Sequence, residues 1–283
     1  MNEPKPTPAT PVAVNYHLYK PCNYRCRFCF ATYRDIRGQL ALEDALRLLS
    51  ALREAGAEKL NFAGGEPTLH PHIGALVGEA KRLGFTTTLI TNGARLDPLL
   101  DDHAADIDWV GISVDSGDEA VQAELGRGKG GHIERSRLHA ARLHALGIRL
   151  KLNTVVTALN WREDMHGLLR ELRPARWKVF QVLAIDGQND GSVEPLLITA
   201  EEFRAFVDRH LDLTAEGLGP VAEDNAAMTD SYAMIDPLGR FYGNHRGRYI
   251  YSPPILEVGV GEALRQVDFE LQRLIRRGGL YLW

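Results

Sequence analysis

Hydrophobic and polar positions along the chain follow two alternating periods. Stretches in which alternate residues are apolar or β-branched predict strands, and stretches with apolar residues three or four positions apart predict helices. The predicted strands are 12–18, 59–63, 86–91, 109–114, 149–156 and 176–183. The helices predicted after them are 41–56, 73–84, 95–104, 132–147, 162–172 and 199–211. This alternation predicts an α/β fold with a parallel sheet, and six units rather than eight predict a partial (β/α)6 barrel.

The alternation stops near residue 212. The stretch "SYAMIDPLGRFYGN" predicts short strands and turns, and a last helix and a glycine-containing tail follow it. At the other end, residues 1–11 are rich in proline and predict a disordered tail. The expected organisation is a tail over 1–11, a barrel over 12–212, and a C-terminal extension over 213–283 that covers the active site.

Composition narrows the class of partner and the compartment. The net charge of −4 does not indicate general attraction to nucleic acid or to an anionic membrane. No apolar run approaches the ~18–20 residues that span a bilayer. All three cysteines lie within eight residues, which favours a reduced metal site over a disulfide framework and predicts a cytoplasmic protein.

The three cysteines, Cys22, Cys26 and Cys29, have the spacing C-x3-C-x2-C. Three thiolates can hold three corners of an iron–sulfur cluster and leave one iron open to a substrate. One alternative is zinc, with His17 or His70 as the fourth ligand, and another is three inert buried cysteines. The cluster is favoured because structural zinc sites usually contain a second, distant cysteine pair, which this chain lacks.

Cationic side chains recur on three of the predicted strands. Side chains two residues apart share one face of a strand, and a closed barrel normally fills its interior with aliphatic residues. If these faces pointed outward, the charges would simply be solvated. If they point inward, a polyanionic ligand is expected, because buried cations need counter-charges and these strands carry no equal set of acids. A nucleoside triphosphate is the simplest such ligand. The pairs are Lys59 and Asn61, Lys151 and Asn153, and Arg176 and Lys178.

The cysteine motif, with the aromatic Phe28 before its last cysteine, resembles the signature of the radical S-adenosylmethionine (SAM) enzymes. The resemblance implies a 4Fe-4S cluster on the three cysteines, with SAM chelating the fourth iron. The stretch "AGGEP" resembles the second motif of that superfamily. It implies that the backbone of Gly64, Gly65 and Glu66 receives the amino group of SAM.

Longer motifs are similar to those of viperin and its prokaryotic relatives. They are "NYHLYKPCNYRCRFCF", "EKLNFAGGEP", "GRGKGGH", "KLNTVV", "RWKVFQ", "DSYAMID" and "ILEVGV…RRGGLYLW". The resemblance covers residues 12–283. It implies conversion of CTP, or of UTP or GTP, into the 3′-deoxy-3′,4′-didehydro nucleotide, a chain terminator in antiviral defence. Another radical SAM enzyme acting on a phosphorylated substrate is the alternative.

The same resemblance implies a role for individual residues. Ser113 and Arg127 would contact SAM, and Tyr232 would act catalytically near the ribose; a mobile loop for Arg127 and core packing for Tyr232 are the alternatives. The triphosphate would be held by Lys59, Lys151, Asn153, Arg176 and Lys178, with Gly278 and Gly279 folded over it as a lid.

Partners follow from the resemblance as well. The cluster needs an electron donor such as flavodoxin or ferredoxin, and the terminal Trp283 resembles a tag read by iron–sulfur assembly machinery. Two positions depart from the animal enzymes. A Pro-rich segment stands where they carry a membrane-binding amphipathic helix, so no membrane association is expected, and Ala63 stands where they have a serine.

Overall fold

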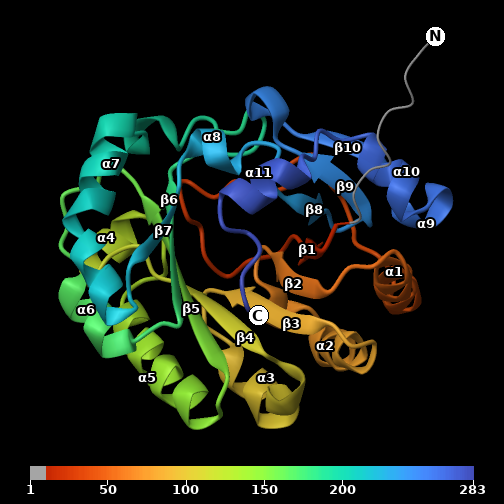
Figure 1. Ribbon diagram of the computed structural model, residues 1–283, viewed down its shortest axis with the longest axis horizontal. Coiled ribbons are helices and arrows are strands. Elements are labelled where there is room, and N and C mark those ends of the chain that lie inside the picture. Colours follow the sequence, from red (N-terminus) through yellow and green to blue (C-terminus); the bar gives the residue numbers. More distant parts are fainter. Residues whose placement is uncertain (1–10) are drawn as a thin grey trace.

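A ten-stranded sheet curved into an open arc, with helices on its convex side, forms the computed structural model (Figure 1). The structure describes residues 11–283, so the predicted disordered tail, apart from Pro11, lies outside the described residues. All six predicted units are present. They are β1 (Ala13–Tyr19) with α1 (Leu42–Glu54), β2 (Lys59–Gly64) with α2 (Ile73–Arg82), β3 (Thr86–Thr91) with α3 (Leu96–His103), β4 (Trp109–Ser113) with α5 (His132–Ala145), β5 (Arg149–Val156) with α6 (His166–Leu172), and β6 (Arg176–Gln181) with α7 (Ala200–Arg209).

The period-two pattern of the strands sorts their side chains between two faces. Leu60, Leu152 and Trp177, which alternate with the cations, are at most 1% exposed and pack in the core between sheet and helices. Full burial of such side chains contributes about 1.5–3 kcal/mol each. The start of α7 is fixed by a capping box, in which the side chains of Thr199 and Glu202 each accept a hydrogen bond from the other residue's backbone N–H.

The C-terminal extension adds strands to both edges of the same sheet. β7 (Pro220–Glu223) pairs in parallel with β6, and β8 (Ala233–Ile235) pairs in parallel with β1. β9 (Arg240–Gly243) and β10 (Ile250–Pro254) continue beyond β8 as antiparallel strands. The order is β10-β9-β8-β1-β2-β3-β4-β5-β6-β7, so the two edges do not pair and the barrel is open, which confirms the partial barrel.

Several short elements were not predicted. β7 was missed because four residues that begin with proline carry too little periodicity to indicate a strand. The extension contains the short helices α8 (Asn225–Met228), α9 (Ile255–Val258), α10 (Val260–Arg265) and α11 (Leu271–Arg276), where the sequence predicted one helix. α4 (Glu119–Glu124) also lies between β4 and α5.

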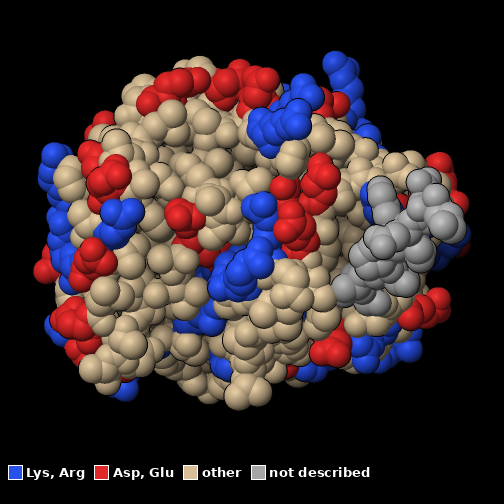
Figure 2. Space-filling model, turned by 45° about the horizontal axis from the view of Figure 1, so that its top comes forward, with Lys and Arg blue, Asp and Glu red and all other residues tan. Residues whose placement is uncertain are grey.

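The described residues include no helix suited to cross a membrane, and the face drawn in Figure 2 has no large patch of side chains of one charge. Within residues 11–283 no helix has the length and apolar character needed to cross a bilayer. Basic and acidic side chains are interspersed on the face shown in Figure 2. That distribution agrees with the small net charge.

A glycine pair joins the end of β2 to the cysteine loop. Gly64 has a φ of +146°, and a Cβ atom on either Gly64 or Gly65 would lie within about 3 Å of backbone carbonyl oxygens of residues 19–21. The close approach allows the Gly65 N–H to donate to the Tyr19 carbonyl (2.5 Å) and the Glu66 N–H to donate to the Pro21 carbonyl (2.9 Å). The loop after β1 is therefore fixed against the end of β2.

The carboxylate of Glu66 ties the end of β2 to the end of β3. Glu66 is 1% exposed. Its oxygens accept from the Thr68 N–H (3.0 Å) and hydroxyl (2.6 Å), from the Thr91 hydroxyl (2.6 Å), and from the Asn92 N–H (2.8 Å). Four donors converge on one buried carboxylate, so this position requires an acceptor on both oxygens.

Replacing Glu66 by glutamine tests this role. In Glu66→Gln, an amide NH2 would face backbone and hydroxyl donors, and leaving buried donors unsatisfied costs about 1–3 kcal/mol in the free energy of unfolding. Urea denaturation of the full chain measures it. Glu58→Gln, on an exposed residue, is the matched control and should change stability by less than about 0.5 kcal/mol. If both variants were as stable as the wild type, the hydrogen bonds of Glu66 would not stabilise the junction between β2 and β3.

Candidate functional site

A cavity of about 300 Å³ on the concave side of the sheet contains nearly all the predicted site residues. The three cysteines line it, and so do the three lysines, the arginine and the two asparagines that were predicted to share one face of β2, β5 and β6. Gly64, Gly65, Ser113, Arg127, Tyr232, Gly278 and Gly279 line it as well. Glu66 does not, because its side chain is buried behind the glycine pair. The cavity therefore brings the predicted thiolates and the predicted cations into one space.

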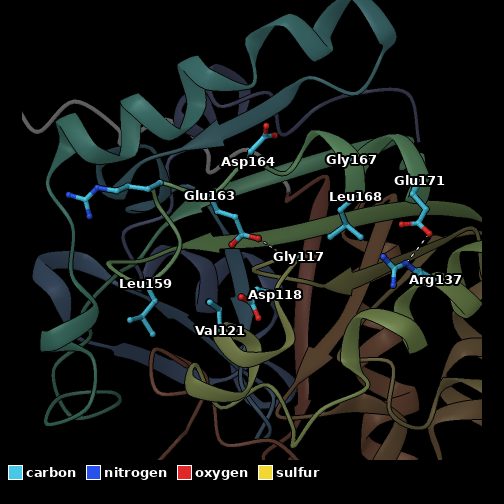
Figure 3. Close-up of a pocket in the computed structure, with 11 residues that line it drawn as sticks. Gly117, Asp118, Val121, Arg137, Leu159, Glu163, Asp164, Gly167, Leu168 and Glu171 are labelled. Atoms are coloured by element: carbon cyan, nitrogen blue, oxygen red, sulfur yellow. Dashed lines mark hydrogen bonds and ion pairs between the residues drawn. The ribbon is translucent and has the colours of Figure 1, made fainter.

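A wider depression of about 770 Å³ lies elsewhere, between α4, α5 and α6 (Figure 3). Acidic residues such as Asp118 and Asp164 line it, Arg137 pairs there with Glu171 (2.9 Å), and the Glu163 carboxylate accepts from the Gly117 N–H (2.5 Å). None of the predicted site residues lines it. The smaller cavity is therefore the candidate site despite its size, because the three cysteines and the buried cations line it.

The cysteine loop is shaped by backbone hydrogen bonds. Arg25 and Arg27 donate their backbone N–H groups to the Gly126 carbonyl (3.2 Å) and the Leu125 carbonyl (3.0 Å), and the Cys29 N–H donates to the Cys26 carbonyl (3.1 Å). The Cys22 sulfur receives the Tyr24 N–H at 3.4 Å. Such N–H···S contacts are typical of thiolates that hold iron–sulfur clusters.

The spacing of the ligand atoms argues against a single zinc ion. Zn–S bonds of about 2.3 Å place two sulfurs no more than about 4.6 Å apart. Among the described residues, one group of three possible ligand atoms lies within 4.8 Å of one another, and it consists of Asp164, His166 and His210. The three cysteine sulfurs do not form such a group. Both ring nitrogens of His210 already bond to backbone groups, of Met165 (2.9 Å) and Phe206 (2.8 Å). The wider cysteine triangle suits a multi-iron cluster.

The proposed zinc ligands do not complete such a site either. His70 does not line the cavity and contacts Gln39 and the His72 N–H. His17 does line the cavity, its Nδ1 has no partner, and burial lowers its pKa to about 3. It packs edge-on against the aromatic rings of Tyr33 and Tyr242.

Arg127 lies next to the cysteine loop. Burial raises the pKa of all three cysteine thiols, and the positive charge of Arg127 opposes that shift at each one. The guanidinium lies over the Phe28 ring (5.2 Å to the centroid) and pairs with the buried Asp115 carboxylate (2.5 Å). Arg127 is thus a fixed group of the cavity wall, which differs from the mobile surface loop that the glycine-rich sequence allowed.

The cations lie toward the opposite end of the strands. Lys59 and Arg176 are the first residues of β2 and β6, and Lys151 and Lys178 are the third residues of β5 and β6. Lys151 is paired in register with Arg176, and Asn153 with Lys178. The cysteine loop follows the carboxyl end of β1. The cavity therefore runs from a thiol end at the carboxyl side of the sheet to a cationic end at the amino side.

One acid from a strand that was not predicted lies beside these cations, while the cation-bearing strands themselves carry no equal set of acids, as expected. Glu223, at the end of the unpredicted β7, is 0% exposed and pairs with Lys178 (2.5 Å) and with Arg277 (3.1 Å). Within residues 11–283, Lys59, Lys151 and Arg176 have no carboxylate within ion-pair distance. Burial and neighbouring cations lower the pKa of Lys59 to about 7. A cationic excess therefore remains.

The C-terminal tail closes the amino end of the barrel. The Lys59 amine donates to the Tyr281 hydroxyl (2.6 Å), and the Tyr281 ring lies 3.9 Å from the Arg176 guanidinium carbon. Arg176 also donates to the Gly278 carbonyl (2.7 Å). Trp283 is half-buried, with the Lys59 amine 4.9 Å from its ring. In Figure 1 the tail runs from α11 into the concave side of the sheet.

Tyr232 lies between the cations and Glu223. Its hydroxyl accepts from the Lys178 amine (2.8 Å) and donates to the Glu223 carboxylate, and the Arg277 guanidinium lies 3.6 Å from its ring centroid. Burial raises its pKa well above the ordinary value. Tyr232 therefore makes specific polar contacts and is more than a packing residue of the core.

Sequence reasoning missed several cavity residues. They are Arg277, Tyr281 and Asn15. Two residues just outside the lining were also missed: Glu223, which pairs with Arg277, and Trp109, whose ring lies 5.3 Å from the Lys59 amine. Arg277 lies in the "RRGG" stretch already singled out, so its charge was the available signal. Three buried polar atoms of the cavity wall, His17 Nδ1, Asn153 Oδ1 and Arg176 Nε, have no hydrogen-bond partner, which is the pattern of a site that fits a polar ligand.

Comparison with known proteins agrees with this site. Residues 16–172 match the model of the radical SAM superfamily. A curated S-adenosylmethionine-dependent nucleotide dehydratase of Lacinutrix mariniflava is 41% identical over 96% of this chain, which spans 58% of that relative's length. One from Flammeovirga pacifica is 40% identical, with 96% of each chain covered.

Solved structures support the fold. Streptococcus suis SuiB, crystallised with S-adenosylmethionine, matches with a TM-score of 0.65 at 18% identity, over 82% of this chain and 59% of SuiB. The radical SAM family uses a 4Fe-4S cluster and SAM, and the three cysteines with the glycine pair beside them fit both. This chain belongs to the radical SAM superfamily and, within it, to the family of the S-adenosylmethionine-dependent nucleotide dehydratases.

Proposed function

We propose that the protein is a radical SAM dehydratase that converts a nucleoside triphosphate, CTP or else UTP or GTP, into its 3′-deoxy-3′,4′-didehydro analogue. The observation that carries the proposal is the single cavity with three cysteines at one end and a cationic excess at the other. The names of the relatives support a nucleotide substrate. The product, which lacks a 3′ hydroxyl, would terminate polymerase chains in antiviral defence.

The cavity residues divide by what they bind. Cys22, Cys26 and Cys29 hold the cluster, and Gly64, Gly65, Glu66, Ser113 and Arg127 hold SAM. Because the N–H groups of Gly65 and Glu66 already bond to residues 19–21, the carbonyl oxygens of this turn are the groups that can receive an amino group. When bound by these residues, the cluster and SAM would supply the radical chemistry that removes the ribose 4′ hydrogen.

The cationic end holds the substrate. Lys59, Lys151, Asn153, Arg176 and Lys178, with the backbone of Gly278 and Gly279, bind the triphosphate. Phosphates anchored there direct the ribose toward the cysteine loop, and the tail excludes water from that end of the cavity. Once the 3′ oxygen has left as hydroxide, the nucleotide needs one electron and the hydroxide one proton. A hydrogen atom from the Tyr232 hydroxyl supplies both, and an external donor then restores the tyrosine.

Partners follow from the chemistry. A flavodoxin or ferredoxin is the proposed electron donor, and the reducing cytoplasm is the proposed compartment because the three thiols must stay free. Iron–sulfur assembly machinery that reads Trp283 is a further proposed partner. Because Trp283 packs beside Lys59 and Tyr281, such a partner must draw it out of the barrel mouth.

The second candidate is another radical SAM enzyme acting on a phosphorylated substrate. The same cationic end favours it, since the cations recognise phosphates rather than a base. Such an enzyme would not form a nucleotide lighter by one water, so the mass of the product separates the two candidates.

The proposal is tested by incubating the reduced, reconstituted protein with SAM and each nucleoside triphosphate separately. Mass spectrometry should find 5′-deoxyadenosine together with a nucleotide lighter by one water. Cys26→Ala, which removes one cluster ligand, should produce neither and should lose the visible absorption of the cluster. Uncoupled 5′-deoxyadenosine with every nucleotide would favour the second candidate. Full activity of Cys26→Ala would overturn the radical SAM assignment.

The cationic end can be tested by binding alone. Lys151→Ala, Arg176→Ala and Lys178→Ala each remove one charge-assisted contact, so each should weaken triphosphate binding by about 1.5–3 kcal/mol. Calorimetry with the nucleotide measures it. SAM affinity should change little in the same variants, which controls for folding. Unchanged nucleotide affinity in all three would exclude phosphate binding at this end.

Tyr232→Phe keeps the ring and removes only the hydroxyl. We expect the variant to bind nucleotide and to cleave SAM, but to form little didehydro product per 5′-deoxyadenosine released. The ratio of the two products is the measurement. A wild-type ratio at the wild-type rate would show that the hydroxyl takes no part, and loss of both products would indicate substrate positioning instead.

A further inference from the structure

This inference rests on the proposed function and concerns the form of its substrate. We propose that the cavity binds the nucleoside triphosphate as its metal-free tetraanion, without Mg²⁺. Most sites that bind nucleotide phosphates place a Mg²⁺ ion between the phosphate oxygens and protein carboxylates. The charges and ligand atoms of this cavity differ from that arrangement.

With all five basic side chains protonated, the cationic end matches the charge of a tetraanion. Five such side chains line it, and Glu223 is the carboxylate in ion-pair contact with two of them, so the net charge is +4 when a bound polyanion keeps every amine protonated. Arg127 also lines the cavity, but Asp115 neutralises it at the thiol end. The five are Lys59, Lys151, Arg176, Lys178 and Arg277.

A magnesium complex would leave this excess only half balanced. The complex carries two fewer negative charges, so part of a largely buried set of cations would stay uncompensated. The dication itself would also lie among ammonium and guanidinium groups. Lys59 and Lys151 have pKa values lowered by burial and by neighbouring cations, so the unliganded site is already repulsive.

The cavity also lacks the ligands that Mg²⁺ requires. Protein-bound Mg²⁺ is usually held by one or two carboxylates in addition to phosphate oxygens. Within the described chain no Asp or Glu lines the cavity; its side-chain oxygens belong to amides and hydroxyls. Glu223 lies behind the wall and is engaged with Lys178, Arg277 and the Tyr232 hydroxyl. The cations thus replace the metal.

The test measures binding to the full-length, cluster-reconstituted protein by calorimetry, with whichever of CTP, UTP or GTP gives product. One buffer contains EDTA, and the other contains enough Mg²⁺ to complex about 99% of the nucleotide, with NaCl matching the ionic strength of the two buffers. Because about one nucleotide in a hundred stays metal-free, the apparent Kd should rise about 100-fold with Mg²⁺. SAM affinity, the matched control, should not change.

Mn²⁺ provides a second readout. When protein is added to a Mn²⁺–nucleotide mixture, it should bind the metal-free nucleotide, so that Mn²⁺ is released from its nucleotide complex. The electron paramagnetic resonance signal of free Mn²⁺ should then grow. Nucleotide affinity that is equal or higher in Mg²⁺, or a ternary Mn²⁺–nucleotide–protein complex, would overturn the inference and leave the proposed function intact. A protein that binds no triphosphate in either buffer would overturn both.

Discussion

The burial of five cations, only two of which pair with a carboxylate of the described chain, is the constraint on which the rest of this structure depends. Burial disfavours a charge unless a counter-charge or a dipole accompanies it. The chain meets that requirement with groups from its C-terminal third: Glu223 on β7, the Gly278 carbonyl and the rings of Tyr232 and Tyr281. Each cation–π contact contributes about 0.5–2 kcal/mol, depending on desolvation. The extension therefore belongs to the site electrostatically as well as sterically.

At the other end of the cavity the constraint is geometric. The cysteine loop must lie against β2 closely enough for its carbonyl oxygens to reach the Gly65 and Glu66 N–H groups, and only glycines at positions 64 and 65 leave room for it. The buried Glu66 carboxylate then fixes the β3 end beside them. Rigid strands thus separate the thiol end of the cavity from its cationic end, which is the arrangement that the proposed reaction of a triphosphate nucleotide requires.

Much of this could be predicted because the signals were periodic. The six βα units follow from alternating strand and helix patterns, and the period of two correctly indicated that Lys59, Lys151 and Arg176 share the face opposite Leu60, Leu152 and Trp177. β7 has four residues and so carried no usable period, and Glu223 was missed with it. The aromatic contacts of the tail could not be predicted, because Tyr281 reaches Lys59 across 222 positions of sequence.

The contacts of Glu223 connect the two halves of the proposed reaction. Lys178 contacts both the carboxylate and the Tyr232 hydroxyl, and that hydroxyl donates to the same carboxylate. A phosphate that binds Lys178 competes with Glu223 for the ammonium group, and any shift of the ammonium changes the hydrogen bonds of Tyr232. Glu223 and Lys178 together therefore fix the position of the Tyr232 hydroxyl in the unliganded protein. An acid that would otherwise weaken anion binding thus orients the Tyr232 hydroxyl and balances part of the buried charge of Lys178 and Arg277.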